Sequence, residues 1–170
     1  MIYSVLQRKE VPVAVTKEII KVYDDIGDVT RYTIHDAEEP LLHVGYVDLQ
    51  DTKNGVNVAF IKSQHPKHYK HFGQIADQIE LEHCLNRGIE NPYIHSVAAI
   101  GTHIQHYLRG KRFINENINV YFDFLTKNLQ KGEKVITGFL GYPKMYMPMN
   151  MINEIKEKIK ISPLLKGIKY

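Results

Sequence analysis

Three segments in the first part of the chain alternate between apolar and polar residues in the manner of β-strands. They cover residues 29–34, 41–49 and 56–61, where β-branched and aromatic side chains are frequent. Between the second and third segments, Lys53-Asn54-Gly55 is a turn signal, because Asn-Gly favours the positive-φ conformations of a tight hairpin. The pattern therefore predicts an antiparallel meander of three strands.

The period changes after Pro66, where apolar residues begin to recur every three or four positions. Such spacing predicts an amphipathic helix, and Gly88 is a suitable residue to end it. The positions that carry this period are Phe72, Ile75, Ala76, Ile79, His83 and Leu85.

Residues 92–99 form a short, apolar segment that is typical of a central strand. A brief helix over residues 102–109 follows, and Gly110 ends it. Because strand, helix, strand and helix succeed one another here, we expect residues 56–61 and 93–98 to pair in parallel.

An apolar stripe follows Phe113 and keeps helical spacing up to Gly132. A strand over residues 134–140 and a last helix, stopped by Ser162-Pro163, are predicted after it. The stripe consists of Ile114, Ile118, Tyr121, Phe122, Leu125 and Leu129. Because so much apolar surface must be covered, we interpret residues 114–170 as an addition that packs on the sheet or on a second copy in a homodimer.

The composition is that of one globular domain. The chain has 170 residues and a mass of 19.7 kDa, with 44% hydrophobic and 24% charged residues, so we expect a single α/β (α+β) domain over residues 1–170. A net charge of +3 is small for a dedicated nucleic-acid-binding protein. The single cysteine, Cys84, excludes an internal disulfide and a cysteine zinc cluster. Neither a signal peptide nor a membrane-spanning run is visible, which predicts a cytoplasmic protein without a membrane partner.

The stretch from Gly55 to Phe113 carries the functional signal. A predicted strand runs into His65-Pro-Lys-His-Tyr-Lys-His-Phe-Gly73, and a later helix ends in Tyr107-Leu-Arg-Gly-Lys-Arg-Phe113. This order resembles the acyl-CoA-dependent N-acetyltransferase (GNAT) superfamily, in which a basic, glycine-containing loop opens a helix between two parallel strands. The start of a helix suits a pyrophosphate, because its first turn offers unpaired N–H donors and a favourable dipole. Gly73 would let the backbone approach, and Lys70 would add a counter-charge.

The resemblance implies a mixed central sheet in which an antiparallel meander precedes two parallel strands that splay apart, with helices on its flanks. It implies acetyl-CoA as the acyl donor, its pantetheine arm in the gap between the splayed strands, and a small-molecule or peptide amine as the acceptor that attacks directly in a ternary complex. The residues that it assigns to CoA are Phe60, Ile61, Ser63, Lys70, His71, Phe72, Gly73, Gln74, Ile75 and Ala76.

Acetyl transfer to an amine needs a base for the acceptor ammonium and an acid for the departing thiolate. The resemblance places Tyr107 near the sulfur as the acid. The predicted strand at 56–61 and its extension to Ser63 contain no Asp or Glu, where many relatives keep one. His65, just past the end of this strand, or a chain of water molecules is left as the base.

A second interpretation is a non-catalytic, GNAT-shaped module that binds CoA or a protein partner. Ile75 stands where relatives have a second small residue, and the strand lacks a carboxylate; both features favour this alternative. A weak nucleic-acid contact beside Tyr69 is a further alternative, which the small net charge disfavours. Its basic residues would be Lys67, Lys70, Arg109, Lys111 and Arg112.

The spacing of His65, His68 and His71 raises the question of a zinc site. Lys67 and Lys70 lie between these histidines, and their charges disfavour a divalent cation. We therefore expect polar side chains near a cofactor loop and no metal.

Overall fold

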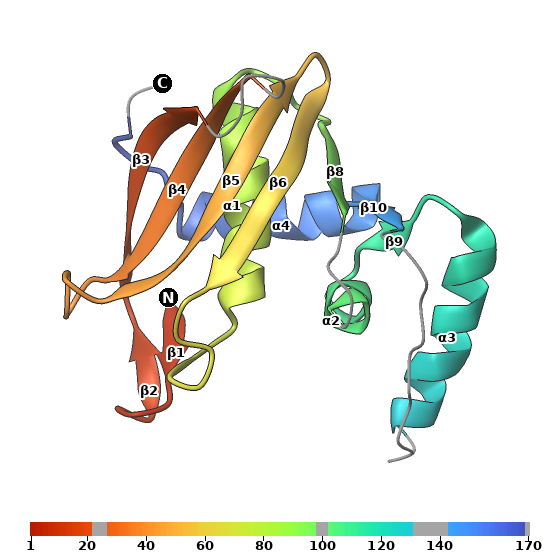
Figure 1. Cartoon of the computed structure of the whole chain (residues 1–170), viewed down its shortest axis with the longest axis horizontal. Helices are drawn as coiled ribbons and strands as arrows, with labels where there is room; N and C mark the ends of the chain where they lie inside the picture. Colours follow the sequence, from red (N-terminus) through yellow and green to blue (C-terminus); the bar gives the residue numbers. More distant parts are fainter. Residues whose placement is uncertain (22–26, 98–101, 131–142, 169–170) are drawn as a thin grey trace.

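The computed structural model describes residues 1–21, 27–97, 102–130 and 143–168 (Figure 1). It is an α+β structure with a large mixed sheet flanked by helices. The strands are β1 (Ile2–Ser4), β2 (Lys9–Val11), β3 (Val13–Lys21), β4 (Asp28–Asp36), β5 (His43–Thr52), β6 (Gly55–Ser63), β7 (Tyr69–Lys70), β8 (Tyr93–Val97), β9 (Arg112–Phe113) and β10 (Lys144–Tyr146). The helices are α1 (Phe72–Asn86), α2 (His103–Leu108), α3 (Glu116–Gln130) and α4 (Met149–Ile161).

The large sheet contains the predicted meander and the predicted parallel pair. Its strand order is β3-β4-β5-β6-β8-β10-β9. Strands β4, β5 and β6 are antiparallel neighbours, as the alternation predicted. Strands β6 and β8 pair in parallel, from Gly55 opposite Tyr93 to Val58 opposite Ser96. The remaining neighbours in this sheet are antiparallel.

Several strands of the structure were not predicted. The outer strand β3 pairs with β4 along its whole length. The short strands form a separate sheet in the order β2-β1-β7, which ties the segment before α1 to the N-terminus. Strands of two or three residues are too short for a period to be visible in the sequence.

Gly55 is required at the β5–β6 hairpin for a reason other than the predicted one. The turn is present, since Thr52 pairs with Gly55. However, Gly55 is not among the glycines with positive φ. A Cβ atom on it would lie 2.0 Å from the carbonyl oxygen of Tyr93, so the missing side chain lets β8 approach β6.

The helix ends agree with their sequence signals. Gly88 follows α1 with a φ of 82°, and Gly110 follows α2 with a φ of 116°, both in the region that glycine adopts without strain. Helix α4 has Ser162 as its C-cap, just before Pro163.

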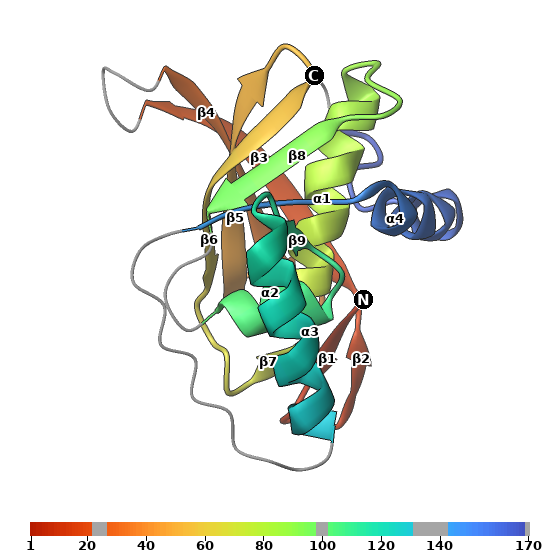
Figure 2. The same cartoon turned by 90° about the vertical axis from the view of Figure 1, so that its right-hand side faces the viewer.

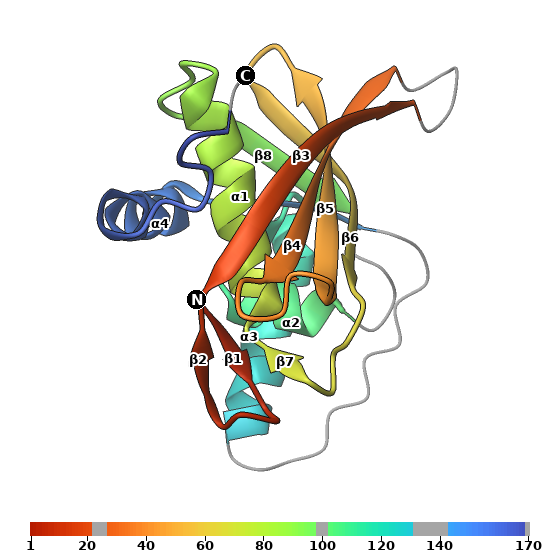
Figure 3. The same cartoon turned by 90° about the vertical axis from the view of Figure 1, so that its left-hand side faces the viewer.

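Helices α1 and α4 lie together on one face of the sheet, and no described helix covers the other face of β3–β6 (Figures 1 and 2). Tyr32 and Val47 of the sheet, Ile79 of α1 and Ile152 of α4 are fully or almost fully buried in one core between these layers. Viewed from the side of β3, the two helices again lie on the same side of the strands (Figure 3). The described part of the molecule thus has two layers here, the sheet and the two helices on its one face.

Helix α3 packs in a second, smaller core. Phe122 and Leu125 are buried there with Tyr107, Phe113 and Met145. The stripe predicted from the sequence is only partly covered, because Ile114 and Tyr121 are exposed. Val120 and Phe124 on the same helix are exposed as well.

The rest of the C-terminal region is built into the main sheet and core. Strand β10 lies between β8 and β9, and Met151, Ile152 and Ile155 of α4 join the main core. The strand predicted at 134–140 lies outside the described residues. No helix in the described part of the chain has the length and apolar character needed to cross a membrane.

Candidate functional site

The described part of the parallel ladder between β6 and β8 lies beside an irregularity of β6. Their parallel ladder runs from Gly55 and Tyr93 to Val58 and Ser96, the last pair in the described ladder. On its other side, β6 has an irregularity at the same level: Val58 pairs with Leu49, and Phe60 pairs with Asp48. Ala59 is therefore the extra residue of a β-bulge, which leaves one residue outside the ladder and bends the strand.

The segment of β6 beyond the bulge is open to solvent. Ala59 and Lys62 are exposed, and Phe60 is 53% exposed although it is a large apolar side chain. Ile61 and Ser63, also predicted to bind CoA, are half-buried. The structure thus leaves the predicted pantetheine segment accessible.

The predicted pyrophosphate loop divides into exposed and buried residues. Lys70, His71 and Gln74 are exposed. Phe72, Ile75 and Ala76 belong to the main core, so their side chains serve packing. Before α1, β7 pairs with β1, and His71 at the N-cap has a left-handed φ of 67°.

Gly73 is essential for the approach of another side chain. A Cβ atom at this position would lie 2.6 Å from Cζ of Arg109, which follows α2. Arg109 therefore covers the first turn of α1, where the sequence predicts a phosphate. Any larger residue at position 73 would displace this guanidinium.

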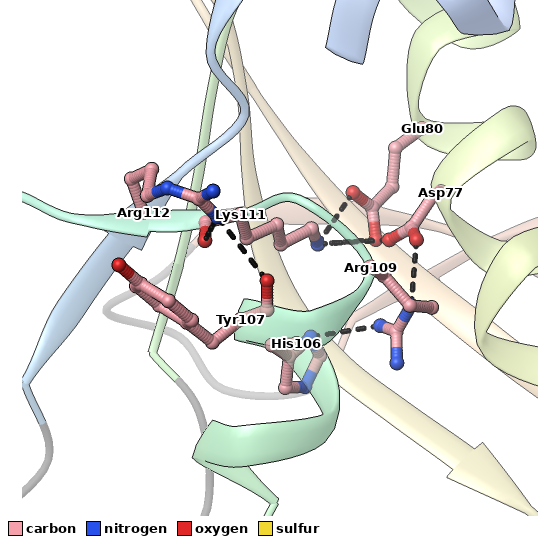
Figure 4. Close-up of polar contacts among 7 residues, drawn as sticks. All are labelled: Asp77, Glu80, His106, Tyr107, Arg109, Lys111 and Arg112. Atoms are coloured by element: carbon pink, nitrogen blue, oxygen red, sulfur yellow. Dashed lines mark hydrogen bonds and ion pairs between the residues drawn. The ribbon is translucent and has the colours of Figure 1, made fainter. Parts of the chain in front are cut away.

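Arg109 belongs to a buried ionic network between α1 and the α2–β9 corner (Figure 4). Its Nε donates to Asp77 Oδ2 at 2.8 Å, and Lys111 Nζ donates to Glu80 Oε2 at 3.0 Å. Lys111 also lies 3.2 Å from Asp77 Oδ1, and both Lys111 and Glu80 have no exposed side-chain surface. Charges so buried are tolerated because each has an opposite partner.

Burial and charge shift the pKa values of this network in different directions. Burial raises the pKa of Glu80 to about 7, although Lys111 opposes the rise. Burial would also raise the pKa of Asp77, but the charges of Lys111 and Arg109 lower it below its ordinary value. Burial, with the charges of Lys111 and Arg109, lowers the pKa of His106 to about 3. Neutral His106 accepts a hydrogen bond at Nδ1 from Arg109 at 2.9 Å.

The sequence prediction overlooked this network. Asp77 and Glu80 are three residues apart among the apolar positions of the predicted helix, and acidic residues inside an apolar stripe are the signal that could have indicated buried cationic partners. Arg109 and Lys111 were considered only as surface cations.

Tyr107, the predicted general acid, is bound to α3. Its hydroxyl donates to Asp123 Oδ1 at 2.6 Å and lies 3.0 Å from the carbonyl oxygen of Asn119. The residue is 4% exposed, and its ring packs against Phe113 and Phe122. Burial, together with the hydrogen bond to Asp123, raises the pKa of Tyr107 to about 12. Within the described residues, no contact joins Tyr107 to His65, the predicted base.

The histidines before α1 do not gather into a cluster that could hold a metal. The rings of His65 and His68 stack with centroids 5.7 Å apart, whereas His71 meets the ring of Tyr3. No group of three metal-ligating side chains occurs within the described ranges.

A cavity of about 620 Å³ lies between α1 and α4 and reaches the first turn of α1. Charged and apolar side chains line this cavity. Among them are Gln74, Asp77, Arg109, Met151, Glu154 and Lys158.

The face of the sheet without a described helix carries polar and aromatic side chains. Arg31 donates to both carboxylate oxygens of Asp48 at 2.7 Å and lies over the ring of Tyr46. Tyr46 in turn stacks on Phe60, with centroids 5.9 Å apart.

Nearer to the end of the parallel ladder, Asn57 on β6 and His95 on β8 form a polar pair, with Oδ1 and Nδ1 3.2 Å apart. The sequence prediction also overlooked this pair. The register alone could have indicated it, since Asn57 and His95 are directly opposite in the parallel ladder.

No family model matches the chain, and no similar curated protein was found.

Proposed function

We propose that the protein transfers an acetyl group from acetyl-CoA to an amine acceptor, by direct attack in a ternary complex. The order of elements supports this proposal: an antiparallel meander, a helix that joins two parallel strands, a second short helix and a closing strand pair, β9 and β10. These are the elements that the resemblance to the GNAT superfamily implies.

The observation that carries the proposal is the bulge at Ala59, one residue beyond the last described parallel pair of β6 and β8. A bulge frees backbone groups from the ladder. An N–H group freed at this point could bind the thioester carbonyl oxygen and stabilise the charge that develops on it during attack. The exposed part of β6 from Ala59 to Ser63 would hold the pantetheine arm.

The positive charges beside the first turn of α1 suit the diphosphate of CoA. Lys70 is exposed beside this turn, and the guanidinium of Arg109 lies against Gly73. Arg109 is already paired with Asp77, but a guanidinium has five N–H donors and can bind a second anion. When bound, acetyl-CoA would supply the thioester, and the chain would supply the hydrogen-bond donors and the proton acceptors.

Arg109 also favours a second candidate function, a non-catalytic module that binds CoA or a protein partner. The close contact between Arg109 and Gly73 leaves less room at the backbone than an open phosphate loop has. The hydrogen bond from the hydroxyl of Tyr107 to Asp123 favours the same alternative.

Hydrogen exchange with and without CoA tests the proposal at the level of the site. We expect CoA to slow amide exchange in 59–63 and 70–75, and to raise the stability of the folded chain. A ligand at 100 times its dissociation constant adds about 2.7 kcal/mol to the free energy of unfolding. Adenosine 5′-diphosphate is the matched control, since it keeps a 5′-diphosphate but lacks the pantetheine arm, and it should protect only 70–75.

Thiol release from acetyl-CoA, measured over a panel of primary amines, separates the two candidate functions. Release that one amine stimulates supports the acetyltransferase. Protection by CoA without release over the whole panel supports the binding module. If CoA changes neither exchange nor stability at millimolar concentration, the acetyltransferase and the CoA-binding module both fail, and only a module that binds a protein partner is left.

A further inference from the structure

His95 lies near the end of the described parallel ladder between β6 and β8. It is opposite Asn57, one pair before the last pair of the ladder, and the bulge at Ala59 follows immediately on β6. Its neighbours in the strand, Ile94 and Ser96, are buried on the side of α1. Because side chains alternate along a strand, His95 is on the opposite face, which no described helix covers.

The hydrogen bond to Asn57 fixes the tautomer of this imidazole. A carboxamide oxygen can only accept, so Nδ1 of His95 donates its proton to Asn57 Oδ1 at 3.2 Å. In the neutral ring, Nε2 then carries the lone pair. No hydrogen bond to Nε2 occurs among the described residues, and the side chain is half-buried.

The neighbouring strands give His95 an aromatic and mildly cationic setting. The ring of Tyr93 stacks on it with centroids 6.0 Å apart, and Tyr146 of β10 is its partner in the antiparallel ladder. Burial, and then the charge of Lys144, lower the pKa of His95 below its ordinary 6.5. These two tyrosines and Lys144 are the titratable groups that face it from β8 and β10, and β6 contributes the neutral Asn57. At neutral pH the ring is uncharged and can accept a proton.

We propose that Nε2 of His95 is the general base that deprotonates the acceptor ammonium, and that Asn57 is the residue that positions it. This inference rests on the proposed acetyltransferase function and assigns the base that the strand β6 does not supply. The acceptor would approach from the face of the sheet on which no described helix lies, while the pantetheine arm would lie along β6 beyond Ala59.

The proton and electron balance is complete with the two substrates and water. His95 takes one proton from the primary ammonium and later passes it to water. The nitrogen lone pair forms a bond to the carbonyl carbon as the carbon–sulfur bond breaks. A second proton then moves from the nitrogen to the departing sulfur, directly or through water. The products are an N-substituted acetamide and free CoA.

The position of the tyrosines indicates the class of acceptor. Tyr93 is half exposed, and its ring stacks on both His95 and Tyr146. The face of a tyrosine ring attracts a cation, so this pair of rings can hold a primary ammonium beside Nε2 until its proton is removed. An aryl amine, which is uncharged at neutral pH, would lose this attraction.

The direct test is an NMR titration of the histidine rings in the full chain, with CoA and with acetyl-CoA as probes. We expect the His95 signals to shift on binding, and to differ between the two probes because only acetyl-CoA places a carbonyl beside the ring. His83, near the C-terminal end of α1 and hydrogen-bonded to Tyr32 and Asp51, is the internal control and should not respond. If both probes bind and the His95 signals do not move, the inference is wrong, whatever the turnover.

Kinetics of three variants test the role of the base. His95→Gln should lower kcat by about 10²–10⁴-fold, the usual contribution of a general base, with the affinity for acetyl-CoA unchanged. Its rate should recover at high pH, where the amine deprotonates without help. Asn57→Ala should cause a smaller fall and move the acidic inflection of the pH profile. His43→Gln should behave as wild type.

The outcomes separate this inference from the function on which it rests. If wild type binds neither CoA nor acetyl-CoA, the proposed function fails and the inference fails with it. If wild type acetylates an amine and His95→Gln does so equally fast with the same pH profile, the function stands and the base is another group.

Discussion

At the scale of single residues, the hydroxyl of Tyr107 has two incompatible roles. As a general acid it must release its proton to a thiolate, whose conjugate acid has a pKa of roughly 8.5 in an ordinary thiol. The structure instead raises the pKa of Tyr107 to about 12, and the hydroxyl donates its hydrogen bond to Asp123. A group that holds its proton so firmly is a poor acid for a leaving group that needs little help. We therefore favour a role in holding α3 to α2.

Tyr107→Phe distinguishes these roles, because it removes the hydroxyl and keeps the ring. We expect a loss of about 1.5–3 kcal/mol in the free energy of unfolding, the range for a hydrogen bond to a charged group, and unchanged kcat in the folded fraction. Urea unfolding and thiol release at a fixed amine concentration provide the two measurements. A fall of about 10² or more in kcat at unchanged stability would instead restore the general-acid prediction.

At the scale of elements, most of the long strands and helices were predictable. The long outer strand β3, the short strands and the details of the site were not predicted. Strands β4, β5 and β6 and helices α1 and α4 have enough residues for a period to appear. Strands β1, β7 and β9 do not, because neighbouring strands and not their own pattern decide their conformation.

The site was harder to predict for the same physical reason. The bulge at Ala59 depends on how β5 pairs with β6, and the Asn57–His95 pair depends on the register of β6 against β8. Neither is a property of one segment. The contact of Arg109 with Gly73 likewise joins residues that are distant in sequence, so a glycine predicted to admit a ligand proved to admit a side chain.

Helix α3 shows how far an apolar stripe determines burial. Phe122 is fully buried, whereas Tyr121 beside it is exposed. Asn119 is buried because its side chain bonds both the N–H and the carbonyl oxygen of Phe113. Thus α3 is fastened to β9 by polar bonds as well as by packing, and its exposed apolar side chains are on a different face.

Phe122→Asp should therefore unfold the second core. The substitution removes a ring that is worth about 3–5 kcal/mol in a typical core and places a charge there. We expect a drop of this order in the free energy of unfolding, or insoluble protein. Phe124→Asp is the matched control on the exposed side of α3, and it should change stability little. Equal stability of the two variants would contradict the packing described above.

At the scale of the whole molecule, one sheet contributes to two hydrophobic cores. Strand β10 joins them, because Met145 is buried in the second core and Met147, just after the strand, in the main core. The ionic network lies between them, with Asp77 and Glu80 on α1 and Lys111 just before β9. The packing of the two parts thus depends on charges that have no contact with solvent.

The pH dependence of stability follows from the groups at this junction. The pKa of Glu80 in the folded chain, about 7, is above its ordinary 4.5. The folded state therefore binds more protons than the unfolded state between these values, and Glu80 lowers stability as the pH rises through this window. His83 and His106 have pKa values below 6.5 in the folded chain. They contribute stability above pH 6.5 that is lost as the pH falls.

Between pH 4.5 and 6.5 these contributions oppose one another. Glu80→Gln removes the contribution of Glu80, which decreases as the pH rises. We therefore expect the free energy of unfolding of this variant to rise more steeply over this window than that of wild type. Urea unfolding at intervals of half a pH unit gives both curves. Glu157→Gln, on the exposed face of α4, is the control and should run parallel to wild type. If Glu80→Gln also runs parallel, Glu80 has the same pKa in the folded and the unfolded chain, and burial does not raise it as described above.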